Sequence, residues 1–316
     1  DMVAFHNSTL GKTWEYTGEL PEEDSLRERA EPYAEWTCPA GGLYPTITVD
    51  VQHDRLAVTA WVYGRGEERW LAFWGEFYGS TMVAHEGAWI ELAQALNKTV
   101  LQTSDAVYSF VRKYNIAGRP VLAVKGASDS VGRIEIWTPP RKVDPNARST
   151  KASRSGVTVH IVGTAKAKDL ILGFSENAGQ IRLEGDGPGR MHWYQGVRDD
   201  FYVQILSEIK IPRRDNPAKR EWKVRTDRRN EGLDCTVYAT YLYRALRLNL
   251  QRPSYWDALE LQLRQAPLLP PADEPDAQRP LVVQGALPQA QAHQPDQHPA
   301  SSSSSNDNIF EPIDLD

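Results

Sequence analysis

Apolar and polar positions alternate along three consecutive segments in the first third of the chain. The alternation predicts strands at 44–51, 56–63 and 68–78, with short polar breaks between them. Breaks of this length favour antiparallel hairpins, because they leave room only for a tight turn. The sequence therefore predicts a three-strand meander that carries Asp50 near the end of its first strand.

A helical spacing of apolar residues marks the segment at 233–250, and Asp234 lies at its start. Between the meander and this helix, the spacing of apolar residues switches between the two-residue period of strands and the 3.6-residue period of helices. It predicts helices at 86–97, 104–114 and 166–174, strands at 120–125 and 157–162, and a short strand ending at residue 193. The expected fold class is therefore α/β, a mixed sheet flanked by helices.

Asp50 is an acidic residue on a predicted strand, and Asp234 is an acidic residue at the start of a predicted helix late in the chain. The ribonuclease H fold uses this arrangement to hold two divalent ions, since Mg²⁺ and Mn²⁺ prefer oxygen ligands. We therefore predict a ribonuclease H-like fold with Asp50 and Asp234 as catalytic and metal-binding residues. Glu231 is a candidate peripheral or water-mediated ligand. On the residues alone, turn formation and helix capping remain alternatives for such acids.

Several short segments, in their order and spacing, carry a resemblance that covers roughly residues 5 to 250. The chain resembles the C-terminal nuclease region of the large terminase subunit of tailed bacteriophages, in its lambda-like group. The matching segments are FHNSTLGKTWE (5–15), TVDVQHDRL (48–56), DAVYSFVR (105–112), VKGAS (124–128), AKDL (167–170), GRMHW (189–193) and RRNEGLDCTVYA (228–239).

The resemblance implies a second acid that this chain lacks. In the family, a strand ending in Asp-Ser-Gly or Asp-Thr-Gly precedes the helix with the Val-Tyr pair, and its Asp is expected to be a metal ligand. Residues 97–105 leave no room for such a strand. Asp105 is the nearest acid and a weak substitute, with a solvent-facing or capping role as the alternative. Ala165 also departs from the family, which tends to have Asp there.

The charge of the chain divides unevenly. Residues 267–316 hold eight acidic side chains and one basic one, a net charge of −7, so the whole-chain value of −6 leaves +1 for the rest. Residues 210–229 hold nine basic and three acidic side chains, and a second basic run lies at 141–154. Basic runs bind DNA phosphates independently of sequence, although a solvated hairpin has the same composition. The proposed DNA contacts are Arg213, Arg214, Lys219, Arg220, Lys223, Arg228 and Arg229.

The chain divides into three regions. Residues 1–43 are interpreted as a linker or docking segment, because they are acidic and contain the breaks PEED and CPAGG. The resemblance implies that such a segment joins an ATPase domain outside this chain, and no phosphate-binding loop motif occurs in the sequence. Residues 44–263 form the predicted nuclease domain. Residues 264–316, rich in Pro, Ala, Gln and Ser, are predicted to be a disordered acidic tail. Neither a membrane-spanning run nor a secretion signal is found.

The sequence hypothesis is a two-metal endodeoxyribonuclease that uses Mg²⁺ or Mn²⁺ to cut concatemeric viral DNA during packaging. The resemblance implies double-stranded DNA, the small terminase subunit and the capsid portal as partners, in the cytoplasm of an infected or lysogenic bacterial host. Two alternatives stay open. One is an inactive terminase fragment that binds DNA or the portal, and the other is a resolvase- or transposase-like nuclease of the same fold.

Overall fold

A computed structural model of the chain describes residues 20–83, 86–95, 120–128, 132–140, 158–173 and 179–265. The strands are β1 (Tyr44–Val51), β2 (Arg55–Tyr63), β3 (Arg69–Tyr78), β4 (Ala123–Gly126), β5 (Val159–Val162), β6 (Met191–Trp193), β7 (Glu208–Pro212) and β8 (Arg220–Val224). The helices are α2 (Glu23–Glu28), α3 (Ala88–Ala95), α6 (Thr164–Leu172), α7 (Asp199–Ile205), α8 (Glu231–Ala245) and α9 (Pro253–Gln265), with short 3₁₀ helices η2 (Arg65–Glu67), η3 (Gln180–Arg182) and η4 (Leu248–Leu250).

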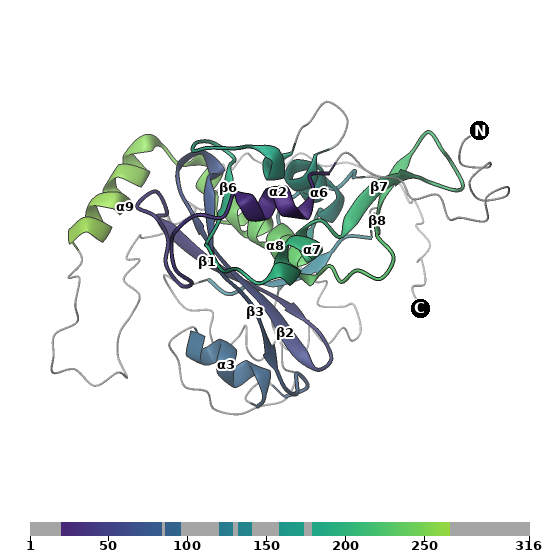
Figure 1. Cartoon of the computed structure of the whole chain (residues 1–316), viewed down its shortest axis with the longest axis horizontal. Helices are drawn as coiled ribbons and strands as arrows, with labels where there is room; N and C mark the ends of the chain where they lie inside the picture. Colours follow the sequence, from purple (N-terminus) through teal and green to yellow (C-terminus); the bar gives the residue numbers. More distant parts are fainter. Residues whose placement is uncertain are drawn as a thin grey trace, which may run out of the picture.

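The central sheet has the strand order β1-β2-β3-β6 (Figure 1). β1, β2 and β3 pair antiparallel, which confirms the predicted meander, and β6 pairs parallel to β3. β4 and β5 form a separate parallel pair, whereas β7 and β8 form an antiparallel hairpin that projects at the right of Figure 1. The mixed sheet agrees with the expected α/β class. Among the described strands β1 pairs only with β2, so the ribonuclease H-like strand order stays a prediction.

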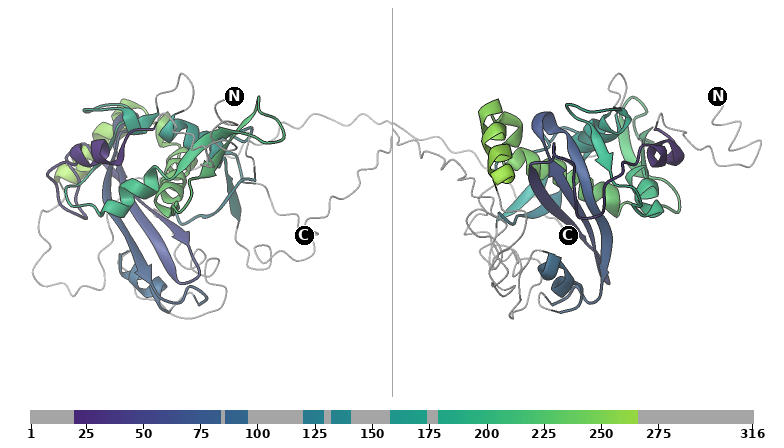
Figure 2. Two further views of the ribbon diagram at one scale, coloured as in Figure 1. Left: turned by 45° about the vertical axis from the view of Figure 1, so that its right-hand side comes forward. Right: turned by 60° about the vertical axis from the view of Figure 1, so that its left-hand side comes forward.

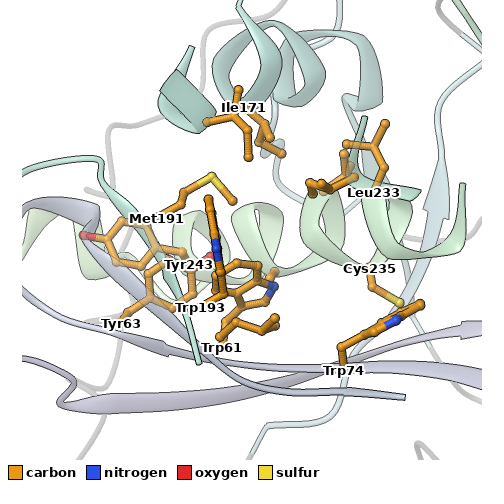
Figure 3. Close-up of a cluster of buried hydrophobic side chains, with 14 of the residues drawn as sticks. Trp61, Tyr63, Trp74, Ile171, Met191, Trp193, Leu233, Cys235 and Tyr243 are labelled. Carbon is orange, nitrogen blue, oxygen red and sulfur yellow. The ribbon is translucent and has the colours of Figure 1, made fainter. Parts of the chain in front are cut away.

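The two faces of the sheet are covered by different helices. On β2 the side chains of Ala57, Trp61 and Tyr63 lie in the main core, against α8. Their neighbours Leu56 and Val58 point to the other face and pack against α3, as expected from the two-residue period of a strand. Figure 3 shows the main core between the sheet and α8, and Figure 2 shows the same layers from two sides.

A buried arginine lies at the end of the sheet where β3 begins. The Arg69 side chain is fully buried. One of its terminal nitrogens donates to the Tyr63 hydroxyl at 3.1 Å and to Thr240 Oγ1 at 2.8 Å, and the other donates to Gln180 Oε1 at 2.6 Å. The guanidinium carbon also lies 5.3 Å from the Trp61 ring centroid. Arg69 therefore joins β2, β3, η3 and α8 through polar contacts inside an apolar core.

The end of one helix differs from the sequence prediction. α8 begins at Glu231 and ends at Ala245, whereas the apolar spacing predicts a helix over 233–250. The helix stops because Arg247 adopts a left-handed conformation (φ 57°), and the chain then turns into η4. Upstream, Leu26 and Leu43 are buried in the main core. Part of the segment before β1 therefore packs against the same hydrophobic core as the sheet and α8.

Some sequence predictions lie outside the described residues. These are residues 1–19 of the predicted linker or docking segment, Asp105 with the whole segment 96–119, the basic run at 141–154, and all but the first two residues of the predicted tail at 264–316. Within the described part of the chain, no helix is long and apolar enough to span a membrane.

Candidate functional site

Strand alternation directs Asp50 toward α8. Thr48 and Asp50 are two residues apart on β1, so their side chains share a face. The Thr48 hydroxyl donates to the Cys235 carbonyl of α8 at 2.9 Å, which fixes this face against the first turns of that helix. Gln52 Nε2 donates to Asp50 Oδ2 at 2.5 Å. Burial raises the pKa of Asp50, and the nearby Glu231 carboxylate raises it further, against the hydrogen bond from Gln52.

Asp234 lies in the first turn of α8, near enough to Asp50 for the two charges to interact. Its Oδ2 accepts a hydrogen bond from Asn230 Nδ2 at 2.9 Å. Burial raises the pKa of Asp234 to about 6, and the carboxylates of Glu208 and Asp50 contribute to the rise, although the Lys168 ammonium acts against it. The structure therefore brings together the two acids that the sequence selects.

The surroundings of Asp234 fit a divalent cation. When ionised, the carboxylates of Asp50, Asp234 and Glu208 carry three negative charges, and the ammonium of Lys168 balances one of them. The three acids offer only oxygen donors, which Mg²⁺ and Mn²⁺ prefer. Uncompensated buried charge is costly unless a counter-charge binds. Asp50 and Asp234 are thus the residues that would hold a divalent ion, and Glu208 is linked to Asp234 through Lys168 and Asn230.

Sequence reasoning missed Glu208 and did not select Lys168. Lys168 Nζ on α6 lies 2.6 Å from Glu208 Oε1 and 3.5 Å from Asp234 Oδ1. Both the Lys168 and Glu208 side chains are at least nine-tenths buried. Lys168 lies in the AKDL segment that carries the family resemblance, which is a usable signal. Glu208 is a single acid at the start of a basic stretch, and no pattern distinguishes it from a surface residue.

Glu231 belongs to a network of arginines at the edge of the site. Its Oε1 accepts a hydrogen bond from Arg55 Nη2 at 2.6 Å, and Arg229 Nε lies 3.2 Å from both of its oxygens. The buried Glu76 forms ion pairs with the same two arginines and with Arg198. The Glu231 carboxylate is therefore bound by two guanidinium groups, and its role as a metal ligand stays a prediction.

Glu76 gives the protein an acid-sensitive contact. Burial alone would raise the pKa of Glu76, but hydrogen bonds from Arg229 and Arg198 outweigh it and bring the value to about 2. Because this pKa lies below its ordinary value of 4.5, the stabilisation is complete above pH 4.5 and is lost as the pH falls toward 2. Because both arginines are almost half exposed, solvent screening limits each of these ion pairs to about 1 kcal/mol.

We expect Glu76→Gln to be less stable than the wild-type protein at neutral pH, with the difference shrinking as the pH falls from 4.5 toward 2. Urea unfolding across this range measures it. A difference that stays constant with pH would show that the ion pairs contribute nothing.

The predicted DNA-contacting residues fall into two groups. Arg228 donates to Glu23 and to the Val203 carbonyl, and Arg229 pairs with Glu76 and Glu231, so both support the fold. The others lie on or beside the β7–β8 hairpin. Of these, Arg214, Lys219, Arg220 and Lys223 are exposed, and Arg213 is half-buried and pairs with Asp215.

A second group of ligand-type side chains lies at the opposite end of β3. Ligand atoms of Glu68, Asp186 and His192 lie within 4.8 Å of one another. His192 is buried and stacks on Trp70 at 5.0 Å between ring centroids. Its Nδ1 lies 2.5 Å from Glu31 Oε1 and its Nε2 lies 3.0 Å from Glu68 Oε1. His192 is thus a packed residue that ties the segment before β1 to β6, as its aromatic neighbours suggest.

Comparison with known proteins identifies the family of the chain. A family model described as the endonuclease domain of the terminase large subunit gpA matches residues 1–105 and 101–256. The large terminase subunit of Escherichia phage lambda is 29% identical over 273 residues, which cover 78% of this chain and 39% of that protein. The large terminase subunit of Enterobacteria phage P21 is 27% identical over 280 residues, covering 79% of this chain and 39% of that protein.

The chain therefore spans about two fifths of the length of these curated relatives. No solved structure matches it. The family model covers most of the chain, including both Asp50 and Asp234, and so confirms the resemblance seen in the sequence. This chain belongs to the family of terminase large-subunit endonuclease domains.

Proposed function

We propose that this chain is a metal-dependent endonuclease that cuts double-stranded viral DNA during packaging. The observation that carries the proposal is the proximity of Asp50 on β1 and Asp234 on α8, two half-buried carboxylates close enough for the charge of one to raise the pKa of the other. Two acids from separate elements, with excess negative charge, are what a divalent metal site requires.

In the proposed reaction, Asp50 and Asp234 bind two Mg²⁺ or Mn²⁺ ions. When bound, such ions activate a water molecule and stabilise the leaving oxygen of the phosphodiester. The protein's own contribution is to fix the two carboxylates. Thr48 holds β1 against α8 through the Cys235 carbonyl, while Gln52 and Asn230 each orient one acid by a hydrogen bond.

Plasmid nicking by the purified chain tests the function. With Mg²⁺ or Mn²⁺ the protein should convert supercoiled DNA to nicked and linear forms, and EDTA should stop the conversion. A folded protein that cuts DNA at no metal concentration would contradict the proposal.

That negative result would favour the second candidate, an inactive terminase fragment that binds DNA or the portal. One observation supports this candidate. The two segments of the family match meet at residues 101–105, within the stretch where the strand with the second acid is expected to be missing. Asp105 as a substitute acid also stays a proposal.

The β7–β8 hairpin is proposed to follow the DNA backbone. We expect the triple replacement of Arg214, Lys219 and Lys223 by Gln to weaken DNA binding. The slope of the logarithm of the binding constant against the logarithm of salt concentration should become shallower by roughly two to three, because each lost phosphate contact releases about one counterion fewer. Fluorescence anisotropy with a DNA duplex at several salt concentrations measures the slope. Replacing Arg252, Arg264 and Arg247, which lie at or near α9, gives a charge-matched control. An equal effect in both variants would contradict a specific role for the hairpin.

By family resemblance, we propose that the whole terminase subunit also meets a small subunit and the capsid portal in the host cytoplasm. The relatives named above are large terminase subunits, which supports an assembly of this kind.

A further inference from the structure

Lys168 occupies a position between two acids beside the candidate metal site. Its Nζ lies 2.6 Å from Glu208 Oε1 and 3.5 Å from Asp234 Oδ1. Asn230 Nδ2 bridges the same two carboxylates, at 3.1 Å from Glu208 Oε1 and 2.9 Å from Asp234 Oδ2. Glu208 and Asp234 therefore share two donors, one charged and one neutral, and form a single polar cluster.

The three elements that meet here make the cluster rigid. Lys168 is on α6, which packs against α8, and Asp234 is in the first turn of α8. Glu208 is the first residue of β7, and its side chain is 4% exposed. A buried carboxylate with no cation would be strongly destabilising, so Glu208 needs the Lys168 ammonium in the metal-free protein.

We propose that Lys168 is the resident counter-ion of Glu208 and Asp234, that a divalent cation competes with it, and that Glu208 then becomes a third carboxylate of the metal site. The proposal rests on the proposed function, because it assumes that Asp50 and Asp234 bind the metal. The strand that carries the second acid in the family is expected to be missing from this chain. In the proposal, Glu208 on β7 replaces that acid.

The charge of Lys168 has a direct consequence for metal affinity. An ammonium 3.5 Å from an oxygen of Asp234 repels a second cation, and the repulsion is strong because the cluster is largely removed from water. Removing the ammonium leaves the buried Glu208 and the half-buried Asp234 without their shared cation. Metal binding should therefore become tighter when Lys168 is lost, the opposite of what is expected if Lys168 only maintains the shape of the site.

Calorimetric titration of the metal-depleted full chain with Mn²⁺ tests the proposal without reference to DNA cutting. We expect Lys168→Met to bind Mn²⁺ at least tenfold more tightly than the wild-type protein. The matched control is Lys166→Met, on the same helix, where the lysine pairs with the exposed Glu135 and the affinity should not change. In the double variant Lys168→Met/Glu208→Gln, the gain in Mn²⁺ affinity should disappear, since the proposal assigns it to the Glu208 carboxylate.

The outcomes separate this proposal from the proposed function. If wild-type binding of Mn²⁺ is absent, or is unaffected by Asp50→Asn and Asp234→Asn, the proposed function fails. If binding depends on those acids but Lys168→Met binds Mn²⁺ equally well or more weakly than the wild type, only the counter-ion role is overturned. A gain that persists in the double variant overturns the role of Glu208.

A second measurement uses the wild-type protein, so that it stands even where Lys168→Met does not fold. Reductive methylation with formaldehyde and cyanoborohydride labels lysine amines, through their neutral form, according to their accessibility and freedom from ion pairs. Peptide mass spectrometry should show that labelling of Lys168 rises when Mn²⁺ is added, whereas labelling of Lys166 does not change. Equal labelling of Lys168 with and without Mn²⁺ would overturn the displacement.

Discussion

Asparagine in place of Asp50 or Asp234 is expected to abolish metal-dependent DNA cutting and to leave the fold intact. Both substitutions keep the size of the side chain and remove the charge that a divalent ion needs. The loss in cutting rate should be roughly a thousandfold or more, since even one hydrogen-bond donor to a transition state contributes a hundred- to a thousandfold. Plasmid nicking with Mn²⁺ at saturating concentration measures it.

The same Asp234→Asn change should stabilise the metal-free protein at pH 8. Burial raises the pKa of Asp234 from 3.8 to about 6. Between pH 3.8 and about 6, Asp234 is therefore mostly protonated in the folded protein and mostly ionised in the unfolded chain. The stability contribution of this group is therefore lost as the pH rises through 4 to 6. The loss corresponds to roughly 3 kcal/mol, and asparagine avoids it.

Asp257→Asn is the control, because Asp257 is an exposed carboxylate on α9 that pairs with Arg65. It should leave both cutting and stability unchanged. Undiminished cutting by Asp50→Asn or Asp234→Asn would contradict the assignment of the site. A metal-free Asp234→Asn protein less stable than the wild type at pH 8 would contradict the account of the buried charge.

Replacing Arg69 by methionine is expected to lower the free energy of unfolding by about 3–5 kcal/mol, the range for breaking a buried charged network. Methionine fills much of the space but leaves the Gln180, Thr240 and Tyr63 oxygens without the donor that they share. Each unsatisfied buried group adds its own desolvation penalty. Urea unfolding monitored by tryptophan fluorescence measures the change.

Arg65→Met is the comparison for this experiment. Arg65 lies four residues earlier in η2 and pairs with Asp257 and Glu260 on the surface. Exposed ion pairs contribute about 1 kcal/mol or less, so this variant should stay close to the wild type. If the two substitutions have equal effects, the polar contacts of Arg69 inside the core do not stabilise the fold.

The sequence predicts the meander to within a residue, because alternation is a property of neighbouring positions. Leu56 and Val58 point one way and Ala57 the other, whatever the rest of the fold does. It also selects Asp50 and Asp234, since the family segments contain both. The end of α8 is less predictable. Arg247 takes a left-handed conformation without the glycine that usually marks such a position.

The pairing of Lys168 with Glu208 could not be predicted. The two residues are 40 positions apart on elements that meet only through the packing of α6, β7 and α8. A lysine and a glutamate are most often solvated, so no local pattern marks this pair as buried. Arg228 and Arg229 show the same limit, because a basic run does not reveal which of its members form ion pairs with other elements of the fold.

The hydrogen bond from Thr48 to the Cys235 carbonyl joins positions 187 residues apart in the chain. A contact of that separation forms only after a long loop has closed, and such contacts are slow to form during folding. Asp50 and Asp234 therefore remain separated until nearly the whole domain has been synthesised and has collapsed around α8. A nascent or partly folded chain therefore has no assembled acidic pair.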